Sequence, residues 1–215
     1  MNFYQEFEKT LAKERGEGKR LLLHSCCAPC SSHVLMLLKE YFTITVLYYN
    51  PNITEHDEYQ KRVQEQIRFI EALNKDKEGA DISYLDGDYV PGKFLEAVKG
   101  YEQIPEGGAR CGICFRMRLE ETARLAKNGG FDYFATTLTV SPLKNAAILN
   151  EIGLEMGEAF GVEYLISDFK KKDGYKHSIE LSAQYDLYRQ DYCGCAFSKA
   201  ERNMRKSVMA GNKCV

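Results

Sequence analysis

The cysteines most constrain how this 215-residue chain can fold, because seven of the eight lie in three short clusters. Thiolates are soft ligands that select iron–sulfur clusters, zinc or copper(I). Six or seven of them exceed the four ligands of a single tetrahedral ion. The pattern therefore predicts either a metal cluster with a second metal or two separate metals. The clusters are Cys26-Cys27-Ala28-Pro29-Cys30, Cys111-Gly112-Ile113-Cys114 and Cys193-Gly194-Cys195, and Cys214 stands alone.

Each cluster contains a residue that helps the backbone to turn. Pro29, Gly112 and Gly194 lie between or beside the cysteines, and we expect sharp turns at these positions. A helix is expected to follow Cys114, and thiols at a helix N-terminus are better ligands because their pKa is lowered there.

Disulfides or structural zinc could also account for the cysteines. The chain begins MNFYQEFE, without an apolar signal segment, and contains no apolar run of membrane-spanning length. We therefore expect a cytoplasmic protein without a membrane partner, in a reducing compartment that disfavours structural disulfides. Because CxxC pairs are common in zinc sites, zinc is kept as an alternative to the iron–sulfur centre that we favour.

The net charge of the whole chain does not predict a polyanionic partner, but the charge of its C-terminal part does. The whole chain has a formal charge of −2, but residues 166–215 contain ten Lys or Arg against six Asp or Glu. Such runs either bind a polyanion or form an ordinary solvated surface. The basic residues that we select are Lys170, Lys171, Lys172, Arg202, Arg205 and Lys206.

Apolar segments alternate with helical patterns along the chain, which predicts a parallel sheet with helices on both faces. We expect one α/β metalloenzyme domain over residues 1–215, with a short N-terminal helix at about 1–16 and a basic helical segment at about 176–215. The expected strands are 20–23, 43–49, 81–85, 131–138 and 162–166. The expected helices are 31–41, 55–74, 93–101, 115–128 and 145–160, with a further helix start at Ser141-Pro142.

Polar segments follow these strands at their carboxyl ends. In open α/β sheets ligands bind at that edge, although turns are polar in any case. Because distant cysteine clusters must meet to share a metal, we expect the site at this edge. The segments are 24–27, 50–52, 86–88, 136–139 and 167–169.

Five longer segments resemble the QueH-type epoxyqueuosine reductases, and the resemblance extends from residue 20 to about residue 198. They occur in the order expected for that family. The segments are 22–31 (LLHSCCAPCS), 49–53 (YNPNI), 110–116 (RCGICFR), 167–172 (SDFKKK) and 188–195 (YRQDYCGC).

The resemblance implies an activity, a fold and a cofactor set. It implies the last step of queuosine biosynthesis, in which the epoxide on a modified wobble guanine of tRNA is reduced to the alkene. It implies a fold like the adenine-nucleotide alpha-hydrolase (HUP-type) domains. It also implies a 4Fe–4S cluster with a further mononuclear iron or other divalent metal, and no cobalamin. The expected partners are the tRNA, whose anticodon arm would meet the basic residues, and an electron donor such as a ferredoxin or flavodoxin.

The ligands are expected among the clustered cysteines, divided between the two centres in a way that the sequence leaves open. Cys30 is set apart because it could face the core from the following helix, and Cys214 is expected to be a bystander. The expected ligands are Cys26, Cys27, Cys111, Cys114, Cys193 and Cys195.

Removing an epoxide oxygen requires two protons, so we looked for donors near the cysteines. Asp168, Asp191 and His24 are the candidates. Each has a second interpretation: the aspartates could ligate the second iron or cap a helix, and His24 could orient a ligand or be structural.

Two functions of other classes compete with the reductase. An ATP-dependent tRNA-thiolating enzyme of the same architecture needs consecutive glycines in a phosphate loop after the first strand. The chain has SCCAPC there instead, at residues 25–30. A zinc-stabilised tRNA-binding module is the non-enzymatic alternative.

Overall fold

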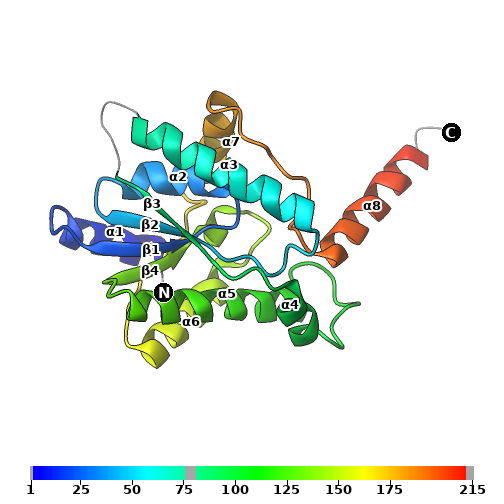
Figure 1. The fold of residues 1–215 in the computed structure, drawn as a ribbon, viewed down its shortest axis with the longest axis horizontal. Helices are drawn as coiled ribbons and strands as arrows, with labels where there is room; N and C mark the ends of the chain where they lie inside the picture. Colours follow the sequence, from blue (N-terminus) through cyan, green and yellow to red (C-terminus); the bar gives the residue numbers. More distant parts are fainter. Residues whose placement is uncertain (1, 76–80, 212–215) are drawn as a thin grey trace.

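The computed structural model describes residues 2–75 and 81–211, and its centre is a five-stranded sheet in the order β3-β2-β1-β4-β5 (Figure 1). Every strand pair is parallel, which confirms the predicted parallel α/β fold; the finer HUP-type assignment stays a prediction. The strands are β1 (Arg20–His24), β2 (Thr43–Tyr48), β3 (Ser83–Asp86), β4 (Tyr133–Thr136) and β5 (Glu163–Tyr164).

Helices cover both faces of this sheet because its central strand is apolar on both sides. Leu21 and Leu23 of β1 pack into a core with α1, α2 and α3, whereas Leu22 packs into a second core with α5 and α6. Figure 1 shows α2 and α3 on one side of the strands and α5 and α6 on the other. The helices are α1 (Phe3–Glu14), α2 (Ala28–Leu38), α3 (His56–Lys75), α4 (Pro91–Ala97), α5 (Ala109–Asn128), α6 (Ala146–Phe160), α7 (Gly174–Gln184) and α8 (Ala196–Gly211).

Two cysteine-bearing helices begin well before the positions that the sequence predicted. Helix α2 begins at Ala28, because Pro29 occupies its first turn, where proline is favoured. Helix α5 begins at Ala109 after an extended Gly108. The expectation of a sharp turn at Gly112 was therefore wrong: this glycine is helical, and its cluster presents cysteines from successive turns of one helix.

Other boundaries differ by smaller amounts. The expected strand 131–138 is shortened to β4 and continues as a 3-10 turn, Thr137–Val140. The helix start expected at Ser141-Pro142 was wrong, because Asn145 caps α6 by accepting hydrogen bonds from the backbone of Ala147 and Ile148.

The region of the predicted basic helical C-terminal segment contains two helices. Helices α7 and α8 are separated by residues 185–195, which include the third cysteine cluster. Helix α8 projects away from the sheet and its covering helices (Figure 1). Among the described residues, no helix is both long and apolar enough to cross a membrane.

Candidate metal centre

The first cysteine cluster lies where the strand order reverses. Strand β1 pairs with β2 on one side and with β4 on the other, so the crevice between the ends of β1 and β4 is the topological switch point. Cys26 follows β1, and Thr137 follows β4. The Cys26 backbone N–H donates to Thr137 Oγ1 over 3.4 Å, and the Thr137 hydroxyl donates to Cys26 Sγ over 3.7 Å.

Cys26, Cys27 and Cys30 form what we call the three-thiol group. Their Sγ atoms all lie within 4.8 Å of one another. Cys27 is buried and Cys26 and Cys30 are half-buried. The early start of α2 places Cys30 in its first turn, directly over the loop that carries the other two. Three thiols this close can bind one soft metal ion.

Hydrogen bonds within this group link the pKa values of its three thiols. Hydrogen bonds from Cys27 and Cys30 hold the pKa of Cys26 well below its usual value. The same contacts, together with burial, raise the pKa of Cys27 and of Cys30. Cys26 is therefore the thiol of this group that loses its proton most readily, and a metal that bound all three sulfurs would displace their protons.

The other four clustered cysteines form the four-thiol group: Cys111 and Cys114 on α5, and Cys193 and Cys195 on the loop before α8. All four line one small cavity. Backbone N–H groups already point at two of the sulfurs, from Gly107 to Cys111 over 3.2 Å and from Ser198 to Cys195 over 3.3 Å. Burial raises the pKa of Cys111 and, to about 12, that of Cys114.

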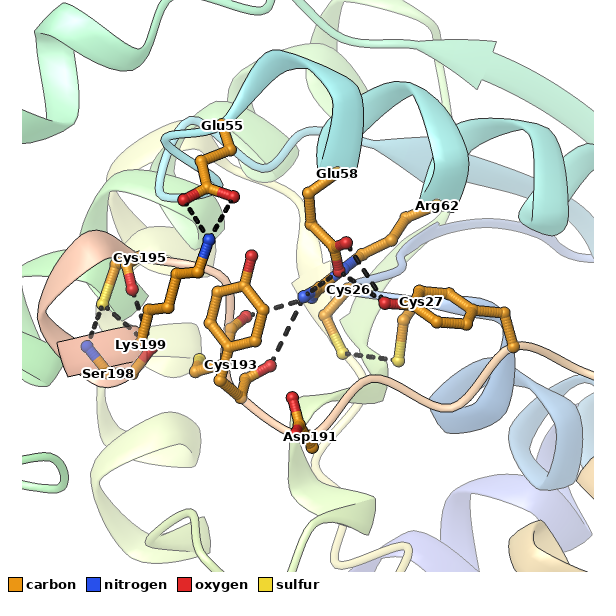
Figure 2. A network of polar contacts seen from close by, with 12 residues as sticks. Cys26, Cys27, Glu55, Glu58, Arg62, Asp191, Cys193, Cys195, Ser198 and Lys199 are labelled. Atoms are coloured by element: carbon orange, nitrogen blue, oxygen red, sulfur yellow. Dashed lines mark hydrogen bonds and ion pairs between the residues drawn. The ribbon is translucent and has the colours of Figure 1, made fainter. Parts of the chain in front are cut away.

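A buried arginine holds the third cysteine cluster against α3 (Figure 2). The Arg62 guanidinium donates to the carbonyl oxygens of Tyr192 and Cys193 over 3.4 and 3.2 Å, and forms an ion pair with Glu58 over 2.6 Å. Gly194 has φ +126°, and an added Cβ would lie 2.8 Å from Ile53 Cγ1. The turn in the third cluster therefore requires a backbone conformation that favours glycine, as the sequence predicted.

The two thiol groups lie beside two neighbouring cavities that share lining residues. Cys193 and Lys144 line both the small cavity and a neighbouring cavity of about 260 Å³, which Cys26 and Cys30 also line. The Lys144 ammonium faces thiols of both groups: burial disfavours its charged form, but Cys193, Cys26 and Cys30 more than offset this and raise its pKa. The larger cavity has basic and aromatic walls as well: Arg62, Arg189, Arg202, Arg205, Tyr175 and Tyr192.

Of the three predicted proton donors, Asp191 lines this larger cavity. It pairs with Lys206 over 2.6 Å and with Arg202 over 3.2 Å. The hydrogen bond from Lys206 and the charges of both partners lower its pKa. Asp191 is therefore an ionised hydrogen-bond acceptor at neutral pH.

The other two predicted donors are engaged away from the cavity. Asp168 is buried and pairs with Lys170 over 2.6 Å. His24 is fully buried between β4 and the loop after β2: Nδ1 lies 2.9 Å from Thr136 Oγ1, and Nε2 lies 3.1 Å from the Tyr49 carbonyl oxygen. Burial lowers the pKa of His24 to about 3, so the imidazole is neutral and suited to orienting the Cys26 loop rather than to donating a proton.

The predicted basic residues divide into two sets. Arg202 and Arg205 on α8 line the larger cavity, and Arg205 pairs with Glu201 over 3.6 Å. Lys172 pairs with Glu8 of α1 over 2.6 Å, and Lys171 is exposed. The run 170–172 therefore belongs to the surface between α1 and α7 rather than to the cavity.

The sequence left the role of Cys30 open and missed two other site residues. Cys30 joins the first group, and its three-residue spacing from Cys27 at a helix start is consistent with this. Lys144 and the buried Arg118 of α5 carried no distinctive pattern, because their positions depend on which segments meet. Cys214 lies outside the described residues.

Fold and site together define the class: a doubly wound α/β protein with a cysteine-rich site at the switch point of its sheet. The family model described as "Epoxyqueuosine reductase QueH" matches residues 21–201. The chain therefore belongs to the QueH family of epoxyqueuosine reductases, which are oxidoreductases.

Relatives of that name cover most of this chain. The protein of Staphylococcus epidermidis is 41% identical over 208 residues, which are 95% of this chain and 87% of the relative. That of Streptococcus pyogenes is 44% identical over 194 residues, which are 90% and 75%. The more distant protein of Thermotoga maritima is 36% identical over 193 residues, 88% of this chain and 95% of the relative. The resemblance noted in the sequence is thus confirmed at the level of the family.

Proposed function

We propose that this protein reduces epoxyqueuosine in tRNA to queuosine. One observation carries the proposal: in a member of this family, seven thiols gather in two groups beside two neighbouring cavities that share Cys193 and Lys144, at the ligand-binding edge of the sheet. Removal of the epoxide oxygen consumes two electrons and two protons, forms the alkene and releases water. Because no side chain supplies two electrons repeatedly, the site must hold a redox cofactor.

The donor sets fit the metals that the resemblance implies. Four thiols around one cavity match the ligand number of a 4Fe–4S cluster, and the three-thiol group matches a further iron or other divalent ion. When bound, these metals supply the electrons and a Lewis acid for the epoxide oxygen. This division uses the six cysteines expected as ligands and adds Cys30.

Protein groups around the larger cavity would hold the substrate. The Lys144 ammonium can donate a hydrogen bond to the oxygen that leaves the ring, because it faces both thiol groups. Asp191, kept ionised by Lys206 and Arg202, can accept a hydrogen bond from the base. His24 and Asp168 act at a distance, His24 by orienting the Cys26 loop and Asp168 by fixing Lys170.

The tRNA would approach over α8. Arg202 and Arg205 line the cavity and Lys206 is next to them, so the phosphates on either side of a splayed-out nucleotide can meet positive charge while the base enters. Residues 170–172 would contact phosphates farther along the tRNA, away from the nucleotide in the cavity. A ferredoxin or flavodoxin would deliver electrons, and the reaction would take place in the cytoplasm.

The experiment uses anaerobically purified, iron-loaded protein with epoxyqueuosine-containing tRNA and a chemical reductant, without ATP, flavin, nicotinamide or cobalamin. The product nucleoside should be queuosine, lighter than the substrate by one oxygen. Omission of the reductant is the control. No reaction by fully iron-loaded protein would refute the proposal, and ATP-dependent incorporation of sulfur would favour the thiolating enzyme. A colourless protein with stoichiometric zinc and no sulfide would favour the zinc module.

A further inference from the structure

Arg118 is a buried charge that the proposed reaction does not yet use. It lies on α5 one turn after Cys114, and only 1% of its surface is exposed. Its Nε donates to the Cys114 carbonyl oxygen over 3.2 Å, whereas its Nη2 is buried without a hydrogen-bond partner. Burying a charge is strongly unfavourable unless an opposite charge compensates it, so Arg118 needs an anionic partner.

Two other arginines are buried to the same degree, and each has a carboxylate. Arg62 pairs with Glu58 over 2.6 Å, and Arg110 pairs with Glu201 over 3.0 Å. For Arg118, no carboxylate oxygen of residues 2–75 and 81–211 lies within 4.0 Å. The compensating charge must therefore come from another kind of group.

The acidic groups around Arg118 are sulfurs. Arg118 lines the small cavity together with all four cysteines of the four-thiol group. Burial favours the uncharged guanidinium, but the negative charge that Cys114, Cys193, Cys26 and Cys111 carry when deprotonated attracts the cation and raises its pKa.

We propose that Arg118 is the fixed counter-charge of the four-thiol group, a positioning residue that makes the occupied centre easier to reduce. Thiols bind metals as thiolates, so a loaded site carries more negative charge than the free one. Adding an electron to an anionic centre is less unfavourable beside a buried cation, where solvent screens little. Lys144 is a second cation beside these sulfurs, and it also lines the larger cavity, where the substrate would bind.

The inference rests on the proposed function only in that the thiols hold metal. Two variants separate charge from packing: R118K keeps the cation, and R118Q keeps an N–H donor for the Cys114 carbonyl but removes the charge. The matched control is R116Q, because Arg116 lies on the same helix, is exposed and pairs with Glu155 over 2.6 Å.

The midpoint potential of the iron-loaded proteins is the first measurement. R118Q should make reduction at least tenfold less favourable, a shift of 59 mV for one electron, whereas R118K should stay closer to the wild-type potential and R116Q should equal it. The second measurement is Co²⁺ affinity of the metal-free chains, followed by thiolate charge-transfer absorption. R118Q should bind Co²⁺ at least tenfold more weakly than R118K.

Equal behaviour of R118K and R118Q in both measurements, whether both match the wild type or both lose metal, would overturn the proposal. If R118Q takes up no iron, the Co²⁺ comparison decides. Neither measurement uses tRNA, so the failure of the wild type to reduce epoxyqueuosine would refute the proposed function without affecting this test.

Discussion

The three-thiol and four-thiol groups are assembled by different means. The three-thiol group is local: its cysteines span five consecutive positions, at the end of β1 and in the first turn of α2. The four-thiol group joins α5 to the loop before α8, and Arg62 of α3 holds that loop in place. A local site depends on one turn of chain, whereas an assembled site depends on packing between distant segments.

Replacing Cys30 should have the largest effect on this comparison. Cys30→Ser should abolish epoxide reduction and remove the second metal, because two thiols are left in its group, while the four-thiol group keeps its iron. Iron and acid-labile sulfide analysis with the tRNA assay checks this. Cys214→Ser is the control and should change neither quantity; full activity of Cys30→Ser would show that Cys30 only packs against the core.

Replacing Arg62 should damage the assembled site selectively. Arg62→Met leaves Glu58 half-paired and frees the Cys193 loop, so the free energy of unfolding should fall by about 3 kcal/mol and the four-thiol group should lose its metal first. Urea unfolding and metal analysis measure the two effects. Lys75→Met, on the exposed end of the same helix, serves as control. Equal loss of metal from both groups would contradict the distinction.

The basic residues should contribute unequally to tRNA binding. Joint charge reversal of Arg202, Arg205 and Lys206 should weaken tRNA binding by about tenfold or more and lower its salt dependence. The same change at residues 170–172 should have a smaller effect, because these lysines do not line the cavity. Binding titrations at several salt concentrations test this, and unchanged affinity in the first variant would identify α8 as an ordinary solvated surface.

Replacing Gly112 or Gly194 with alanine should have opposite effects on the stability of the fold. Gly194→Ala should destabilise the fold by about 1–3 kcal/mol, because φ is +126° and Ile53 is too close. Gly112→Ala should be neutral or stabilising by up to about 1 kcal/mol, because Gly112 is helical and an added Cβ there meets nothing within 4 Å. Thermal unfolding of the two variants measures this difference in stability. Similar losses of stability in both variants would contradict the prediction.

The smallest effect concerns acid stability of the helix that carries Cys30. His33 of α2 lies 2.9 Å from His177 of α7 between their Nδ1 atoms, and burial, then the charge of His177, lowers the pKa of His33 to about 4. The unfolded chain binds this proton more readily, so stability is complete above about pH 6.5 and falls towards pH 4. The loss is small because the imidazole is partly exposed and solvent screens its charge.

His33→Gln should therefore flatten the loss of stability between pH 6.5 and pH 4. Urea unfolding at several pH values measures the slope. His56→Gln, at an exposed position, is the control and should leave the slope unchanged. Identical slopes for His33→Gln and the wild type would show that other groups govern acid unfolding.

The sequence by itself determined the parallel α/β sheet, the edge at which the cysteines gather and the family. These features depend on local signals: β-branched runs such as residues 43–49, helical periodicity in 55–74, and cysteine spacing within each cluster. Only the tertiary structure decided that Cys30 joins Cys26 and Cys27, that α5 meets the loop before α8, and that Arg118 lines the cavity of the four-thiol group. The physical reason is that periodicity reports which face of an element is apolar, whereas the neighbours of a polar side chain depend on packing between segments far apart in the chain.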